Sequence, residues 1–339
     1  MLLAVVASSI LIISLINPID QTSQRQYASA QENTITPSNN NNNKTTTNTT
    51  FFPKVNNYTS SPPGPVNSWI IETTNGVVLI DTQRTLSEAK NLVDEIKKIN
   101  KPILGVIITH SHPDHIGGIA VLLDGIANVP IYSSQTTFDH IKNDTKGFIA
   151  LTKQIHGDDY SDQIVLPNRI VNSGENITID GTTYDFENIG PGEAADMTIV
   201  YLPSQKILFT GDLVNNRMHP ALVEGHSSEW IKQLMHINLN YFDTKILFPG
   251  HGQAGSPRTL LDEQLNYINT FKSLVEQQMQ SVAKVEGERE ATANITEEGK
   301  MRIKSELQRL YPDYLPVASV PTILDLNIDA VAKEIGQDK

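Results

Sequence analysis

The chain of 339 residues contains no cysteine. Disulfide bonds and thiolate metal ligands are therefore excluded, and so is lipid attachment through an N-terminal cysteine. The formal net charge is −12, and no stretch of the chain is dense in lysine and arginine. Because nucleic-acid binding depends on counterion release by clustered cations, we expect no nucleic-acid partner. A small anionic substrate remains possible.

Residues 1–19 lack charged side chains, including the basic residues that usually begin an export signal. Residues 2–16 are almost wholly apolar, so we predict a signal peptide or membrane anchor over 1–30. Residues 31–62 are rich in Asn, Thr, Ser and Pro and are predicted to be a disordered linker, because they bury little apolar surface. The protein is therefore expected outside the cytoplasm, either secreted or attached to the membrane by its N-terminal segment.

The apolar pattern predicts a folded domain over residues 63–285 and a helical C-terminal extension over 286–339. Strands are expected at residues 66–72, 76–81, 103–109 and 245–248, with several more within 170–213. Helices are expected at residues 86–99 (with Ser87 as a cap), 228–239 and 257–285. This order predicts an α/β fold in which two packed sheets are flanked by helices. We expect the extension to pack on the outside of the domain; covering the mouth of a site is the second option.

Four potential metal ligands directly follow the predicted buried strand at residues 103–109. They are His110, His112, Asp114 and His115. A strand that ends in this pattern brings imidazole and carboxylate groups into one small volume, and such groups suit zinc, iron or manganese. A loop that is merely rich in histidine does not explain why His251 also lies at the end of an apolar strand.

Two later segments share one design, in which an apolar strand ends in glycine and a ligand-type side chain follows. They are Gly211-Asp212 and Gly250-His251. Glycine lets the backbone turn tightly and brings the next side chain close to a metal. Asp212 has two oxygens with which to bridge two cations, and His251 is available to complete a second ligand shell.

These motifs together resemble the metallo-beta-lactamase superfamily of metal-dependent hydrolases, over about residues 66–285. The resemblance implies a four-layer αβ/βα sandwich with two divalent metal ions, typically Zn²⁺, at the edge of the sheets. It also implies that His110 and His112 hold the first metal and that Asp212 bridges both. The ligands that it implies for the second metal are Asp114, His115 and His251.

One position departs from the common pattern of the family. Most members have a histidine after Gly-Pro-Gly, whereas Gly190-Pro-Gly192 is followed here by Glu193. This is similar to the alkylsulfatase branch, although the bridging residue of that branch is commonly glutamate. We expect Glu193 to be a ligand of the first metal, with Mn²⁺ or Fe²⁺ tolerated there. The alternative is an exposed loop carboxylate, and Asp196 is expected to orient a neighbour from outside the ligand shell.

The expected activity is hydrolysis of an ester-like bond in a small molecule by a hydroxide that bridges two cations. The candidate bonds are a sulfate ester, a lactone, a β-lactam and a thioester. Asp114 is the expected catalytic residue, because it is placed to hold the attacking water and to move its proton to the leaving group. Arg217 and His219 are weaker candidates for substrate contact, and a solvated loop is the simpler interpretation. A redox diiron protein and a non-catalytic binding protein are the alternative functions.

Overall fold

The computed structural model describes residues 53–162, 164–286 and 295–337. The predicted signal or anchor at residues 1–30 and the linker up to residue 52 lie outside these residues. The described residues all belong to one compact unit, Phe51–Lys339. Within the described ranges, no helix combines the length and the apolar character that crossing a bilayer requires.

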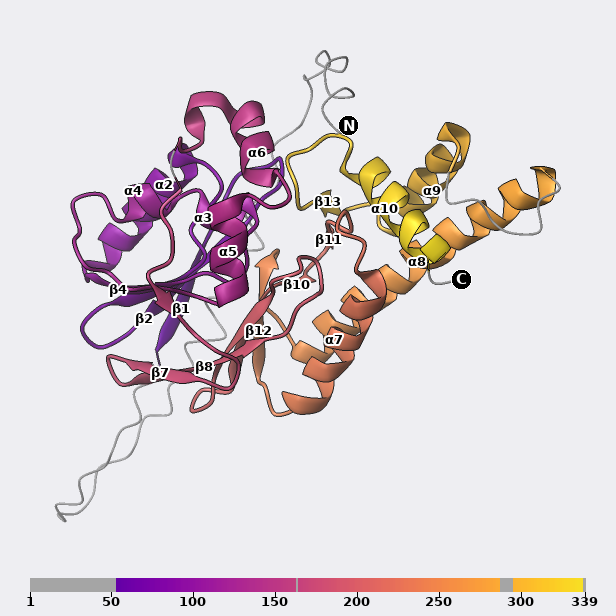
Figure 1. The fold of residues 1–339 in the computed structure, drawn as a ribbon. Helices are drawn as coiled ribbons and strands as arrows, with labels where there is room; N and C mark the ends of the chain where they lie inside the picture. Colours follow the sequence, from indigo (N-terminus) through magenta and orange to yellow (C-terminus); the bar gives the residue numbers. More distant parts are fainter. Residues whose placement is uncertain (1–52, 163, 287–294, 338–339) are drawn as a thin grey trace. The chain divides into compact units, whose positions relative to one another are not determined.

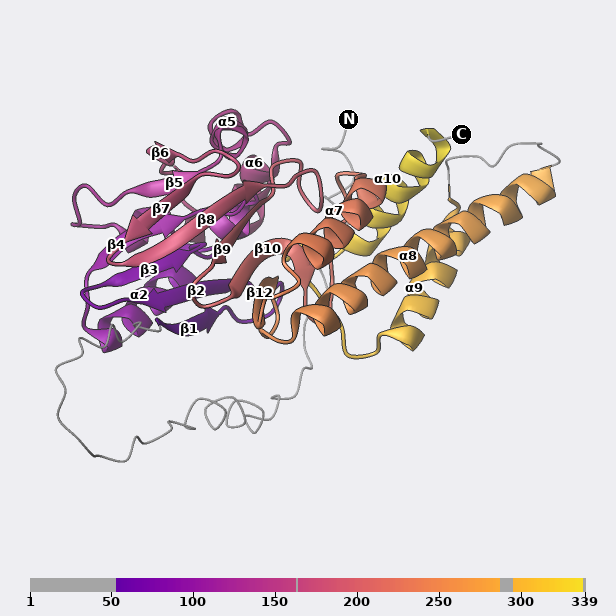
Figure 2. The same cartoon turned by 90° about the horizontal axis from the view of Figure 1, so that it is seen from below.

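The first sheet has six strands, which lie side by side in the order of the chain. Figure 1 shows this sheet at the left, and Figure 2 labels all of its strands. The first three strands pair antiparallel, and the later strands pair parallel. The strands are β1 (Lys54–Thr59), β2 (Asn67–Glu72), β3 (Val77–Ile80), β4 (Ile103–Ile107), β5 (Ile131–Ser133) and β6 (Arg169–Ile170). Strand β3 is apolar and buried at every position, as expected for a strand that is covered on both faces.

The second sheet has five strands in the order β12-β10-β9-β8-β7. Strands β10 and β12 pair parallel, and the other neighbours pair antiparallel. The strands are β7 (Asn176–Ile179), β8 (Thr182–Asn188), β9 (Thr198–Leu202), β10 (Ile207–Asn215) and β12 (Ile246–His251). The strand-rich stretch predicted at residues 170–213 therefore supplies most of this sheet.

The two sheets face one another across an apolar layer. In this layer the ring of Phe248 lies 4.7 Å from that of Phe209 and 4.9 Å from that of Trp69, measured between centroids. Trp69 Nε1 also donates a hydrogen bond to the carbonyl oxygen of Pro249 at 2.9 Å. The first sheet is thereby attached to the strand that ends in His251.

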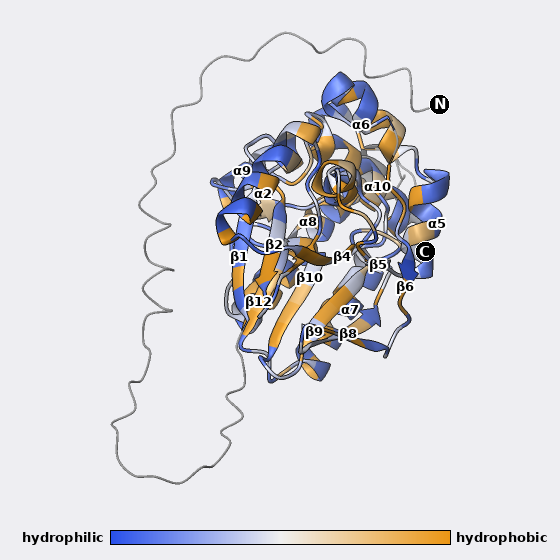
Figure 3. Ribbon diagram, turned by 90° about the vertical axis from the view of Figure 1, so that its left-hand side faces the viewer, coloured by the Kyte–Doolittle hydropathy of each residue, from blue (hydrophilic) through white to orange (hydrophobic). Residues whose placement is uncertain are grey.

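Helices cover the outer faces of both sheets (Figure 2). On the first sheet the apolar sides of α2 (Leu86–Ile99), α3 (Pro113–Ile116), α4 (Ile119–Leu122) and α5 (Gln135–Asn143) are buried. On the second sheet α7 (Ser227–Asn240) and α8 (Pro257–Glu286) contribute a second core. Figure 3 shows the hydrophobic colouring along strands such as β10 and β12, whereas α5 is largely hydrophilic. The predicted mixed α/β fold is confirmed.

The C-terminal region is helical, as predicted. Helices α9 (Glu297–Leu310) and α10 (Ile323–Gln337) pack against α8, beside which they lie in Figures 1 and 2. The segment between them forms β13 (Leu315–Pro316), which pairs with β11 (Met218–His219). The extension thus reaches past the outer helices to the loops that follow β10.

Two local expectations need correction. Strand β1 lies inside the stretch predicted as linker, because its six residues pair in continuous register with β2 and so gain backbone hydrogen bonds. Ordered structure therefore begins before residue 63. Helix α2 has the predicted bounds, but its cap is Thr85, whose side chain accepts from the amide of Glu88. Ser87 lies within the first turn and instead donates to Asp159 at 2.6 Å.

Candidate metal centre

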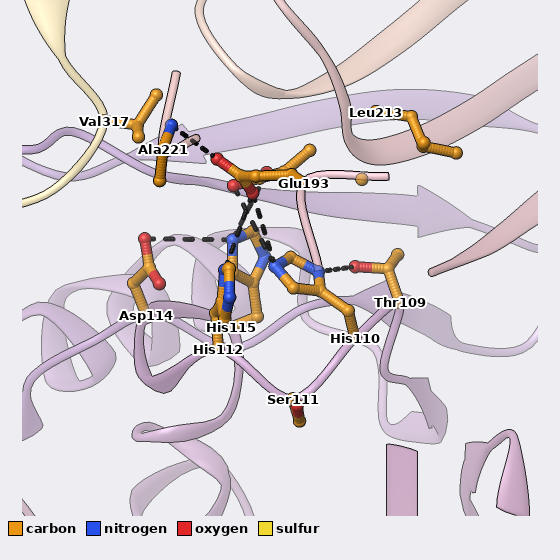
Figure 4. A network of polar contacts seen from close by, with 12 residues as sticks. Thr109, His110, Ser111, His112, Asp114, His115, Glu193, Leu213, Ala221 and Val317 are labelled. Carbon is orange, nitrogen blue, oxygen red and sulfur yellow. Dashed lines mark hydrogen bonds and ion pairs between the residues drawn. The ribbon is translucent and has the colours of Figure 1, made fainter. Parts of the chain in front are cut away.

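The histidine motif lies where the first sheet meets a short helix. Strand β4 ends at Ile107, and α3 begins at Pro113 with His112 as its N-cap residue. Proline suits the first helical position, since its fixed φ angle is already helical and its missing amide hydrogen is not needed there. The turn into this helix directs His110 and His112 toward Glu193, and His115 lies beside Asp114 (Figure 4).

The second sheet brings its contribution from the adjacent ends of β10 and β12. The register between these strands shifts around Gly211, which has a φ of +51°. Gly250 is in such close contact with Asp212 that a β-carbon there would overlap the Asp212 carboxylate. The two predicted glycine motifs are thus neighbours, and the absence of a side chain at Gly250 makes room for Asp212 beside His251.

All seven predicted ligand residues come together, in two adjacent groups with ligand atoms no more than 4.8 Å apart within each group. The first group consists of His110, His112, Glu193 and Asp212; the second consists of Asp114, His115 and His251. Asp212 also borders the second group, because its Oδ1 lies 3.3 Å from His115 Nε2 and its Oδ2 lies 2.9 Å from His251 Nε2. Glu193 is only 1% exposed, so it is not the exposed loop carboxylate of the alternative.

Hydrogen bonds fix the tautomer of the three fully buried histidines. His115 Nδ1 lies 2.8 Å from the Asp81 carboxylate, and His251 Nδ1 contacts the carbonyl oxygen of Pro65. His110 Nδ1 lies 3.0 Å from the hydroxyl of Thr109, whose own hydrogen is donated to Asp81 at 2.8 Å. Because these oxygens act as acceptors, each Nδ1 carries the hydrogen, and each neutral ring keeps Nε2 as a lone-pair donor.

In the neutral rings these Nε2 lone pairs face carboxylate oxygens rather than hydrogen-bond donors. His110 Nε2, His115 Nε2, Glu193 Oε2 and Asp212 Oδ1 are buried, and none receives a hydrogen bond from the described residues. Buried polar atoms are normally paired, so a cluster of acceptor atoms without donors calls for an explanation. Cations between them would satisfy these atoms, and the donor set of imidazoles and carboxylates fits zinc, manganese or iron.

The electrostatics of the cluster point the same way. Burial, with the nearby charge of Asp212, raises the pKa of Glu193 well above its ordinary range. Burial also lowers the pKa of His110, and the neighbouring histidines add to this effect. Burial alone would raise the pKa of Asp114, but two positive charges hold that pKa below its usual value. One is His115, which is protonated when no cation is bound because Asp212 and Asp81 outweigh its burial and raise its pKa, and the other is Arg84. Bound cations would offset the cost of crowding these carboxylates out of water.

Two residues that support the ligands were missed by the sequence reasoning. Asp81, at the end of β3, also accepts the Thr109 amide at 2.9 Å and so orients both His110 and His115. Arg84 is 7% exposed and donates to Asp114 Oδ2 at 3.0 Å and to the Val317 carbonyl at 3.1 Å. An apolar strand that ends in aspartate, on the same sheet edge as the histidine motif, was a usable signal for Asp81. No local pattern marks Arg84.

The remaining candidates lie outside the two groups. Asp196 Oδ1 accepts from Ser111 at 3.0 Å and lies 3.3 Å from His140 Nδ1, in keeping with an orienting role. Arg217 is exposed and pairs with Asp313. His219 is 4% exposed and contacts the Tyr267 hydroxyl at 2.8 Å, so the solvated-loop interpretation is wrong for His219.

The fold and the two ligand groups define a candidate metalloprotein of the paired-sheet α/β class. The sequence pattern of the metallo-beta-lactamase superfamily matches residues 61–251. The chain therefore belongs to the metallo-beta-lactamase superfamily.

Named relatives include enzymes with different substrates. A linear primary-alkylsulfatase from Pseudomonas sp. is 24% identical over 233 residues, which cover 58% of this chain and 43% of the alkylsulfatase. A metallo-beta-lactamase from Chryseobacterium indologenes is 26% identical over 191 residues, covering 55% of this chain and 72% of that enzyme. The crystal structure of the DIM-1 metallo-beta-lactamase has a TM-score of 0.50 at 22% identity, covering 64% of this chain and 97% of that one. This structural likeness supports the fold alone.

Proposed function

We propose that the protein is a dinuclear metal-dependent hydrolase that cleaves an ester-like bond in a small molecule. The observation that carries the proposal is the convergence of imidazole lone pairs and carboxylates in two buried groups. Membership of the superfamily and the hydrolase names of its relatives support it. Structural ion pairs alone do not account for acceptor atoms that face one another without a donor.

We assign the first cation to His110, His112 and Glu193, and the second to Asp114, His115 and His251. Asp212 lies between the groups and is assigned to both. When bound, two such cations supply Lewis acidity and lower the pKa of a water molecule, so that hydroxide is available near neutral pH. Zn²⁺ is the expected metal, and the oxygen ligand Glu193 favours tolerance of Mn²⁺ or Fe²⁺ in the first group.

Asp114 is the residue to which we assign proton transfer. Its Oδ2 accepts from Arg84, and its side chain is 13% exposed, whereas the histidines of the second group are fully buried. Oδ1 is therefore the atom we assign to hold a proton on its way to the leaving group. His115 and Arg84 hold the pKa of Asp114 low, so the carboxylate is ionised and passes a proton on readily rather than retaining it.

The substrate is proposed to be a small molecule with a sulfate ester, lactone, β-lactam or thioester bond. The similarity to an alkylsulfatase, together with Glu193 in place of the common histidine, supports the sulfate ester. The similarity to metallo-beta-lactamases supports the β-lactam. Chromogenic substrates of each class, tested on the full chain with Zn²⁺ or Mn²⁺, distinguish between them.

Metal analysis tests the proposal directly. The full chain should bind two equivalents of Zn²⁺, and Glu193→Gln should bind about one, because the amide keeps the shape of the carboxylate but loses its charge. Glu187→Gln is a matched control, since Glu187 also pairs with a histidine, His236, but lies in neither ligand group. Less than one equivalent in the parent after reconstitution would refute the proposal.

Activity assays separate the alternatives. Zinc or manganese together with turnover of one substrate class supports the hydrolase. Iron together with consumption of oxygen or nitric oxide would instead indicate a redox diiron protein. Metal-free protein without turnover would instead indicate a non-catalytic binding protein with the same fold.

An extracytoplasmic location is a separate proposal, supported by the apolar, uncharged residues 2–16. Fractionation of cells that express the full chain tests it, and recovery of all the protein from the cytoplasm would contradict it. Attachment to the membrane through residues 1–30, rather than secretion, would leave the protein in the membrane fraction.

A further inference from the structure

The loop between β11 and α7 contacts the first ligand group at two points. The amide of Ala221 donates to Glu193 Oε1 at 3.0 Å, as Figure 4 shows. Three residues later, Glu224 Oε1 lies 3.2 Å from His112 Nε2. This loop therefore touches His112 and Glu193, two first-group ligands that come from different segments of the chain.

The Glu224 contact determines which nitrogen of His112 faces the group. An ionised carboxylate only accepts hydrogen bonds, so His112 Nε2 carries the hydrogen. The lone pair of the neutral ring is then on Nδ1, which lies 3.5 Å from Glu193 Oε2. Glu224 is held for this role by burial, with a side chain 4% exposed, and by Lys146 Nζ at 3.3 Å from its other oxygen. His226 Nε2 also lies 3.8 Å from that oxygen.

Helix α10 of the C-terminal extension holds the loop at both ends. Asn327, which is fully buried, donates to the Pro220 carbonyl at 2.8 Å and accepts from the Leu222 amide at 2.7 Å. Glu334 accepts from the amides of Ser227 and Ser228, at 3.0 and 2.9 Å. The anchored residues thus bracket Glu224. The negative charge of Glu334 at the N-terminus of α7 also interacts favourably with the positive end of that helix dipole.

We propose that Glu224 is a positioning residue for the first ligand group and that α10 holds it in place through Asn327. The C-terminal extension then sets, through Asn327 and this loop, how tightly the first group binds its cation. Its contact with the second group is a separate one, in which the Val317 carbonyl accepts from Arg84. This inference rests on the proposed metal centre. Carboxylates that accept the second ring hydrogen of a metal-bound histidine orient the ring and raise its basicity, and their loss typically weakens metal binding 10–100-fold.

Stepwise Zn²⁺ binding to the full chain, measured in competition with a chelator, tests the inference. Variants His110→Ala and His251→Ala first identify which binding step belongs to which group. Glu224→Ala should then weaken the first-group step about 10–100-fold and leave the second-group step unchanged. Glu224→Gln should weaken the first-group step less than Glu224→Ala does, because the amide oxygen still accepts the His112 hydrogen. Asn327→Ala should weaken the same step as Glu224→Ala.

The matched control is Glu187→Ala, which removes a glutamate that pairs with His236 at 2.8 Å outside the ligand groups. It should leave both binding steps unchanged. Parental affinity in both Glu224 variants, or equal weakening of both steps, would overturn the positioning role. Parental affinity in Asn327→Ala would overturn the part assigned to α10. Failure of the parent to bind two cations would instead defeat the proposed function itself, so the two failures are distinguishable.

Discussion

The buried histidines of the candidate centre each use their two ring nitrogens for different purposes. In His110, His115 and His251 the Nδ1 hydrogen is donated to an oxygen, and Nε2 faces the carboxylates. His112 has the opposite arrangement, because Glu224 occupies its Nε2 side. The chemistry available at the centre thus depends on residues that are not ligands themselves.

His219 makes a testable contribution to the pH dependence of stability. Burial lowers the pKa of His219 to about 4, from about 6.5 in the unfolded chain. The unfolded chain therefore binds a proton that the folded chain does not, and stability falls as the pH drops from 6.5 to 4. The loss attributable to His219 is about 3 kcal/mol when complete. Denaturant unfolding at several pH values measures it.

His219→Gln should remove that part of the pH dependence, since glutamine does not titrate. The same change at His236, whose side chain is 38% exposed, is the control. A variant that loses stability between pH 6.5 and 4 as steeply as the parent would contradict the assignment. This comparison uses the difference between variants, so that titration of the ligand groups cancels.

The ligand types were predictable from the sequence, whereas most of their supports were not. The spacing from His110 to His115 is local, and Asp212 and His251 each follow a glycine at the end of an apolar strand. Arg84 and Glu224 belong to loops whose contacts depend on the complete fold. Their positions in the sequence carry no repeat or motif that would point to His112 or Asp114.

At the scale of single elements, Gly250 is a residue of β12 whose lack of a side chain makes room for the Asp212 carboxylate. Gly250→Ala should displace Asp212, because the added β-carbon would overlap its carboxylate. Since Asp212 borders both groups, we expect Zn²⁺ binding to weaken at both, by at least about 10-fold on the scale of lost ligand support. Chelator competition measures this loss.

Gly255→Ala is the matched control for that change. A β-carbon at Gly255 would meet only Leu260 at ordinary contact distance, 3.5 Å or more. Metal affinity of this variant should equal that of the parent. Equal affinities in the Gly250 and Gly255 variants would show that Asp212 is not constrained by β12 in the way described.

The bounds of an element could be predicted from the sequence where its own residues carry the hydrophobic spacing that defines it. Helix α2 begins and ends as predicted, because its apolar residues recur at helical spacing and Asn100 ends it in a left-handed conformation. Strand β1 was missed, since its residues are all exposed or half-buried and lie within a stretch of polar composition. Only its pairing with β2, which the sequence does not display, makes it a strand.

For the whole molecule, metal and stability are expected to be linked. Asp114, Glu193 and Asp212 are brought together with little exposure to water, and cations would relieve their repulsion in the folded chain alone. Free Zn²⁺ at 100 times the dissociation constant should add about 2.7 kcal/mol per site to the free energy of unfolding. Thermal unfolding with Zn²⁺ and with excess chelator measures the difference.

The Glu193→Gln variant should show a smaller difference than the parent, because one of its two sites is weakened. Identical unfolding temperatures with metal and with chelator would argue against metal binding by the folded chain.

The paired-sheet architecture was predictable because strands and helices alternate along the chain, and the sequence displays this alternation. The link from α10 to the ligand groups through Asn327 is a long-range contact and was not predictable in this way.

The positions of the ligands along the chain have a consequence for biosynthesis. Strand β12 supplies His251 and pairs with β10 only after nearly all the sheet residues have been made. A nascent chain still short of β12 has the histidine motif but lacks a complete second group. Under the proposed function, a complete pair of cation sites therefore exists only after β12 has left the ribosome, so the metal is acquired after synthesis of this strand and not before it.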